Sequence, residues 1–117
     1  MQFRFTDRVL KLKIRLAQAT QQLSTAGYQS FAGYVGNYIV QLNNELDELK
    51  YTTTSEDAEL HLDNCYKHLT DMQNVFLAGK LGVGEKVDAQ TLTIINEMKT
   101  EVKDLIRRQQ YIGNVQN

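Results

Sequence analysis

The chain has 117 residues, of which 13 are Lys or Arg and 14 are Asp or Glu, so its formal net charge is −1. This length fits one domain, and an apolar content of 42% is typical of globular rather than disordered proteins. The near-neutral charge excludes a global positive field, the apolar runs are too short to span a membrane, and the lone Cys65 excludes an internal disulfide.

The absence of proline favours long helices between glycine breaks, and therefore an all-α fold. The charged start of the chain is not followed by an apolar stretch that would make a signal peptide. We therefore expect a cytoplasmic protein.

The first helix is predicted over residues 5–26, where apolar residues form a heptad-like seam. These residues are Phe5, Val9, Leu12, Leu16, Ala19 and Leu23. Beside the seam, Arg4, Arg8, Lys11 and Arg15 recur at helical spacing and make one basic stripe. Such a stripe is either a solvated edge whose long stems cover apolar surface or a rail that binds phosphate groups.

The second helix is predicted over residues 31–50, with Ser30 as its N-cap. Its seam consists of Phe31, Val35, Tyr38, Leu42, Leu46 and Leu49. Gly33 and Gly36 lie inside this range and each costs about 1 kcal/mol relative to alanine, which indicates a close backbone approach or a frayed first turn.

The third and fourth helices are predicted over residues 55–78 and 88–112, capped by Thr54 or Ser55 and by Asp88, with a glycine-rich break between them. The third seam is Ala58, Leu62, Cys65, Leu69, Met72 and Phe76, and the fourth is Leu92, Ile95, Val102, Leu105, Gln109 and Ile112. The pattern fades from Gln109 onward, so we expect a frayed tail. The simplest packing is a single up-down-up-down four-helix bundle over residues 1–117.

His61, Cys65 and His68 are the candidate metal ligands of the third helix. Zinc normally takes four ligands from two segments, and the chain offers no other Cys or His. Cys65 lies within the apolar seam, where free cysteines act as small hydrophobes. We therefore predict no metal, no cofactor and no catalytic nucleophile.

Carboxylates near the junction of the second and third helices make the best enzyme hypothesis. Glu45, Glu48, Glu56, Glu59 and Asp63 would gather around Mg²⁺ as in nucleotide pyrophosphohydrolases of the MazG type. Asn44 stands where that pattern has a further carboxylate. The alternative interpretation is a solvated acidic face.

The last helix mixes both signs of charge, with Glu97, Glu101 and Asp104 against Lys99, Lys103, Arg107 and Arg108. Glu97 and Glu101 are like-charge neighbours at four residues, so pairing within the helix is incomplete. If the first and last helices are neighbours, five residues combine into a candidate surface for RNA or DNA phosphate. They are Arg8, Lys11, Arg15, Arg107 and Arg108.

The order of motifs in residues 60–108 resembles a family of four-helix bundles. The motifs are Leu-His-Leu-Asp at 60–63, Val-Phe-Leu-Ala-Gly at 75–79, the capped restart at 87–90, Glu-Met at 97–98 and Leu-Ile-Arg at 105–107. The family includes the accessory protein (Avd) of diversity-generating retroelements and proteins encoded in intervening sequences of 23S ribosomal RNA genes. Leu105 stands where the family usually has Trp.

The resemblance implies a non-enzymatic bundle that assembles into a homo-oligomer, a pentamer in the accessory protein, and binds reverse transcriptase and nucleic acid through basic surface. That accessory protein is strongly basic, whereas this chain is nearly neutral. Two other functions stay open: an adaptor bundle that binds protein partners without nucleic acid, and the Mg²⁺-dependent pyrophosphohydrolase.

Overall fold

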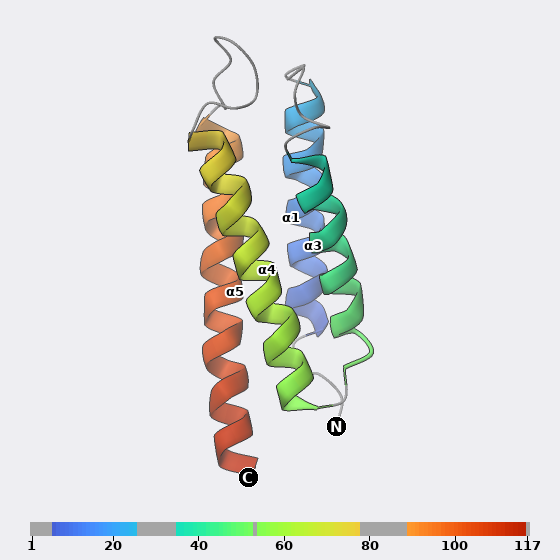
Figure 1. Ribbon diagram of the computed structural model, residues 1–117, viewed down its shortest axis with the longest axis vertical. Helices are drawn as coiled ribbons and strands as arrows, with labels where there is room; N and C mark the ends of the chain where they lie inside the picture. Colours follow the sequence, from blue (N-terminus) through green and yellow to red (C-terminus); the bar gives the residue numbers. More distant parts are fainter. Residues whose placement is uncertain (1–5, 26–34, 53, 78–88, 117) are drawn as a thin grey trace.

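The computed structural model describes residues 6–25, 35–52, 54–77 and 89–116, which form four α-helices and contain no strand (Figure 1). The helices are α1 (Thr6–Thr25), α3 (Gly36–Leu49), α4 (Ser55–Leu77) and α5 (Ala89–Gln116). The prediction of an all-α four-helix bundle is confirmed.

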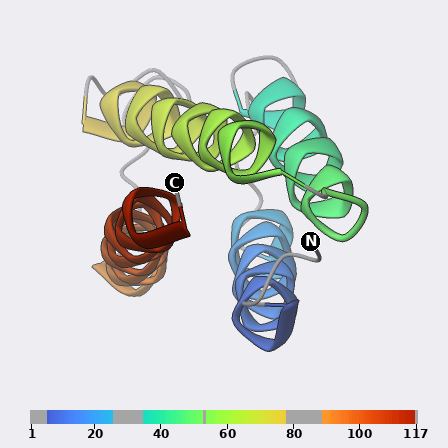
Figure 2. The same ribbon diagram turned by 90° about the horizontal axis from the view of Figure 1, so that it is seen from below.

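The helices pack side by side in the order α1, α3, α4, α5, with α5 returning to contact α1 (Figure 2). Neighbouring helices are antiparallel, since contacts such as Lys13 to Asp47 and Ser55 to Gln109 join residues in the first half of one helix to late residues of the next. The bundle is elongated, measuring 52 × 20 × 20 Å. Each helix therefore buries one stripe and leaves the opposite face to solvent.

The core is a single apolar cluster to which all four helices contribute. The seam residues predicted on α1 and α4 are buried wherever they are described, because their alternating three- and four-residue spacing keeps them on one face. The seams on α3 and α5 are wider than predicted. They also bury Ile39, Ile94, Met98 and Thr91, while Tyr38 and Leu92 are only partly buried.

Helix α3 begins at Gly36, whereas the sequence pattern placed its start at 31. Val35 occupies the N-cap position and makes no side-chain capping hydrogen bond. The expected cap Ser30 and the seam residue Phe31 lie outside the described residues, as do Phe5 and Asp88.

Helix α5 continues to Gln116, so the expected frayed tail after Gln109 is wrong for the backbone. Gln109 is buried and its side-chain amide donates a 2.9 Å hydrogen bond to Ser55 Oγ at the start of α4. This contact anchors α5 where its apolar pattern ends. The last turns of α5 extend past the ends of α3 and α4 (Figure 1).

Candidate nucleic-acid interface

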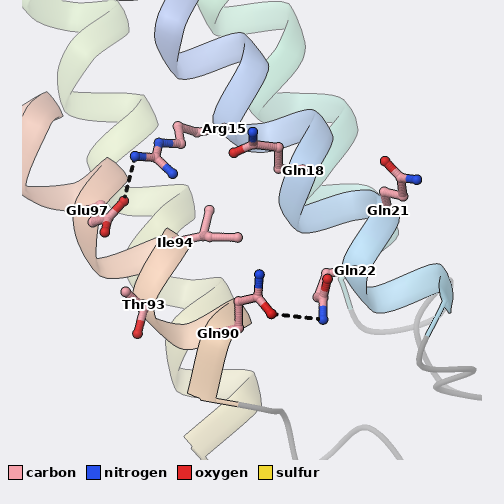
Figure 3. Close-up of a pocket in the computed structure, with 8 residues that line it drawn as sticks. All are labelled: Arg15, Gln18, Gln21, Gln22, Gln90, Thr93, Ile94 and Glu97. Carbon is pink, nitrogen blue, oxygen red and sulfur yellow. Dashed lines mark hydrogen bonds and ion pairs between the residues drawn. The ribbon is translucent and has the colours of Figure 1, made fainter.

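A groove runs between α1 and α5 along the side of the bundle. One hollow of about 540 Å³ is lined by side chains from both helices, half of them glutamines, with Ile94 directed towards α1 (Figure 3). A second hollow of about 540 Å³ is lined by Arg8, Lys11, Leu12, Arg15, Glu97, Met98 and Glu101. Arg15 and Glu97 line both hollows, so the two make one continuous groove.

The charged end of the groove is organised around Arg8. Its Nε donates a 2.5 Å hydrogen bond to Glu101 Oε1, and its Nη2 donates a 2.6 Å bond to Asp104 Oδ2. Arg108 Nε donates to the same Asp104 oxygen at 2.9 Å, from four residues further along α5. Two cations and two carboxylates from distant parts of the sequence thus form one network.

Further along the groove the contacts repeat. Arg15 Nη2 lies 3.0 Å from Glu97 Oε2, and Gln22 Nε2 donates a 3.5 Å hydrogen bond to Gln90 Oε1 (Figure 3). Three contacts follow one another along the groove: residue 8 with 104, 15 with 97 and 22 with 90. From one contact to the next, the position moves by seven residues on each helix. This is the spacing at which flanking residues of packed helices meet, as in a coiled coil.

The ion pairs favour the charged state of their members. The hydrogen bond that Arg8 donates to Glu101 is the main reason why the pKa of Arg8 is raised further above its already high value. Hydrogen bonds from Arg8, and then from Arg108, hold the pKa of Asp104 below its usual value. The Arg8 guanidinium and the Asp104 carboxylate therefore stay ionised at neutral pH.

Four of the five predicted phosphate-binding residues lie along this groove or in its ion-pair network: Arg8, Lys11, Arg15 and Arg108. Arg107 is exposed, and as the direct neighbour of Arg108 on a helix it faces about 100° away. Lys11 is also exposed and has no carboxylate within ion-pair distance among the described residues. The candidate surface was conditional on the first and last helices being neighbours, and α1 and α5 do pack against each other.

Sequence reasoning missed the acidic residues of the groove. Glu97, Glu101 and Asp104 were treated as charges within one helix, whereas each pairs with an arginine of α1. One sequence signal could have indicated this pairing: Arg8 and Arg15 are seven residues apart, and so are Glu97 and Asp104. The arrangement places positive charge on one wall of the groove and negative charge on the other.

The other carboxylate candidate lies between α3 and α4. Glu45 contacts His61 Nδ1 at 2.5 Å through Oε2 and accepts a 3.2 Å hydrogen bond from Asn64 through Oε1. Among the side chains that the structure describes, no three His, Cys, Asp or Glu residues are placed to hold a metal ion. Glu45 thus acts as an interhelical hydrogen-bond acceptor.

Cys65 lies in the core with no exposed surface. Burial, with a smaller contribution from the nearby Glu45 charge, raises the pKa of its thiol to about 12. A thiol in this state is protonated at neutral pH and is a poor nucleophile. The interpretation of Cys65 as a small core hydrophobe is consistent with this placement.

The fold and site together define an all-α four-helix bundle with a charged groove between its first and last helices. None of its described helices combines the length and apolar character needed to cross a bilayer. No family model matches the chain, and no curated protein or solved structure is significantly similar to it.

Proposed function

We propose that the protein is a non-enzymatic, cytoplasmic accessory or scaffold protein that assembles into a homo-oligomer and binds RNA or DNA through the α1–α5 groove. A reverse transcriptase is the protein partner that the sequence resemblance implies. The observation that carries the nucleic-acid part is the convergence of Arg8, Lys11, Arg15 and Arg108 along one groove.

The chemistry of these side chains suits phosphate. A guanidinium presents parallel N–H donors that match two phosphate oxygens, and an ammonium adds a mobile point charge. Arg8 and Arg15 have side chains that are 27% and 48% exposed, so a strand lying in the groove can reach both. Exposed ion pairs are each worth only about 0.2–1 kcal/mol, so phosphate can replace a carboxylate partner at small cost.

Assembly is supported by a different face of α1. Leu10 and Ile14 are 51% and 54% exposed and lie four residues apart, so they sit next to each other on the helix surface. Adjacent exposed apolar side chains are a feature of protein contact surfaces. This pair equally favours the second candidate function, a protein–protein adaptor without nucleic-acid binding.

The nucleic-acid part is tested by fluorescence anisotropy with a labelled single-stranded RNA at low and raised salt. We expect wild type to bind and K11Q/R15Q to bind about tenfold more weakly, with a shallower salt dependence because fewer counterions are released. The variant K50Q/K67Q, which removes two exposed lysines from outside the groove, is the matched control. Equal weakening in both variants, or no binding by wild type, contradicts a groove that binds RNA.

A further inference from the structure

The three acidic residues of the groove occupy the positions that phosphate would take on the basic wall. Carboxylate oxygens of Glu101 and Asp104 lie 2.5 Å and 2.6 Å from nitrogens of Arg8, and Glu97 lies 3.0 Å from Arg15. Each carboxylate is thus close enough to form an ion pair with a guanidinium, the same kind of contact that guanidinium makes with phosphate. Arg8 and Arg15 of the basic stripe are therefore already paired with anions of the same chain.

The charges of the groove nearly cancel. Arg8, Lys11, Arg15 and Arg108 contribute four positive charges, and Glu97, Glu101 and Asp104 contribute three negative ones, which leaves a net charge of +1. A polyanion that enters the groove therefore meets little net attraction and has to displace carboxylates from the arginines. The same three arginines and Lys11 without these carboxylates would present a field of four positive charges.

We propose that Glu97, Glu101 and Asp104 of α5 mask Arg8 and Arg15 of α1 by pairing with them, so that the groove binds polyanions more weakly than it would with these two arginines unpaired. The proposal rests on the proposed function, because it describes the regulation of that same groove. The mask is an intramolecular competitor: it acts without any movement of the backbone, since the arginine side chains at the groove surface can exchange a carboxylate for a phosphate.

The ion pairs differ in how easily a phosphate group can replace the carboxylate on the arginine. Arg15 and Glu97 have side chains that are 48% and 49% exposed, whereas Arg8 is 27% exposed and holds two carboxylates. Exposed pairs are weakened by solvent and salt, and partly buried pairs are weakened less. A phosphate group should therefore replace the carboxylate of Glu97 on Arg15 before it replaces those on Arg8. Glu97 is for this reason the first acidic residue to test.

The test compares two triple variants that carry the same total charge. E97Q/E101Q/D104N removes the mask, and E48Q/E56Q/D63N removes three exposed acidic residues of α3 and α4. Each changes the formal net charge from −1 to +2 by removing three negative charges. We expect the mask variant to bind labelled single-stranded RNA at least about tenfold more tightly than the control variant, with a steeper salt dependence.

A single and a double variant keep the test valid if the triple variant unfolds, which circular dichroism would reveal. E97Q should bind RNA more tightly than wild type, and R15Q/E97Q should lose that gain because the unmasked cation is gone. The masking proposal is overturned if the mask variant binds RNA no more tightly than its control. It is also overturned if the higher RNA affinity of E97Q persists in R15Q/E97Q.

The outcomes separate this proposal from the proposed function. RNA binding by wild type without any gain in the mask variant overturns the mask and leaves the proposed function standing. Binding by the mask variant alone supports the mask and contradicts nucleic-acid binding by the unmodified protein. No binding by any of the proteins overturns both.

Discussion

Asp104 links the two ends of the chain, because its carboxylate accepts hydrogen bonds from Arg8 of α1 and from Arg108 of α5. The same residue connects the stability of the bundle to the charge state of the groove. Its side chain is 31% exposed, so solvent screening keeps the effect of its ionisation on the stability of the fold modest.

We expect Asp104 to make stability depend on pH in the acidic range. Its pKa is lower in the folded protein than in the unfolded chain, so its ion pairs stabilise the fold fully above the unfolded pKa, near 4, and are lost as pH falls through the folded value. Urea unfolding at a series of pH values should show a smaller loss between about pH 5 and 2 in Asp104→Asn than in wild type. An identical pH dependence in the two proteins contradicts the role of Asp104.

Cys65 provides a test of the core at single-residue resolution. Its thiol is buried and its pKa is raised to about 12, so both access and the thiolate fraction are low at pH 8. We expect the native protein to react with a thiol reagent at least about a hundredfold more slowly than the urea-unfolded chain. Comparable rates in the two states would mean that the α4 seam is not packed as described.

At the scale of single helices, α4 has the best-defined start. Thr54 Oγ1 accepts a 3.1 Å hydrogen bond from the backbone N–H of Asp57, three residues later, which identifies Thr54 as the cap. The sequence left Thr54 and Ser55 as alternatives, and the side chain of Ser55 instead bonds Gln109 of α5.

We therefore expect Thr54→Ala to lower the free energy of unfolding by about 1 kcal/mol, because an amide of the first turn loses its acceptor. Thr54→Ser keeps a hydroxyl and should stay within about 0.5 kcal/mol of wild type. Chemical denaturation monitored by circular dichroism measures both. Equal stability of Thr54→Ala and wild type would show that the cap contributes nothing.

The apolar seams were the part of the structure most open to prediction. A helix buries whatever recurs at intervals of three and four residues, so Leu62, Leu69 and their neighbours could be assigned from spacing alone. Ile94 was missed because it flanks the line through Ile95 and Val102, whereas Met98 lies on that line, three residues after Ile95, and was left out of the predicted seam. On α5 the buried stripe is wider than one heptad seam.

The groove could be predicted only in part, since spacing within one helix says nothing of which helix lies opposite. The basic stripe on α1 was visible in the sequence, but its acidic partners became identifiable only once α1 and α5 were known to be antiparallel neighbours. Their matching seven-residue steps then fix the register of the two helices.

At the scale of the whole molecule, opposite charges on the two walls of the groove explain how a nearly neutral chain can carry a local basic stripe. The ion pairs hold α1 against α5 on the outer side of the apolar core, while the exposed pair Leu10 and Ile14 faces elsewhere. In the proposed function, nucleic acid and other copies of the chain would therefore contact different surfaces of α1.

The most direct test of the account is light scattering on the purified protein, with and without a structured RNA, at low and then at raised salt. The account predicts a discrete oligomer that gains mass with RNA at low salt and releases it as salt rises, because phosphate contacts release counterions. A monomer whose mass is unchanged by RNA at low salt would contradict it.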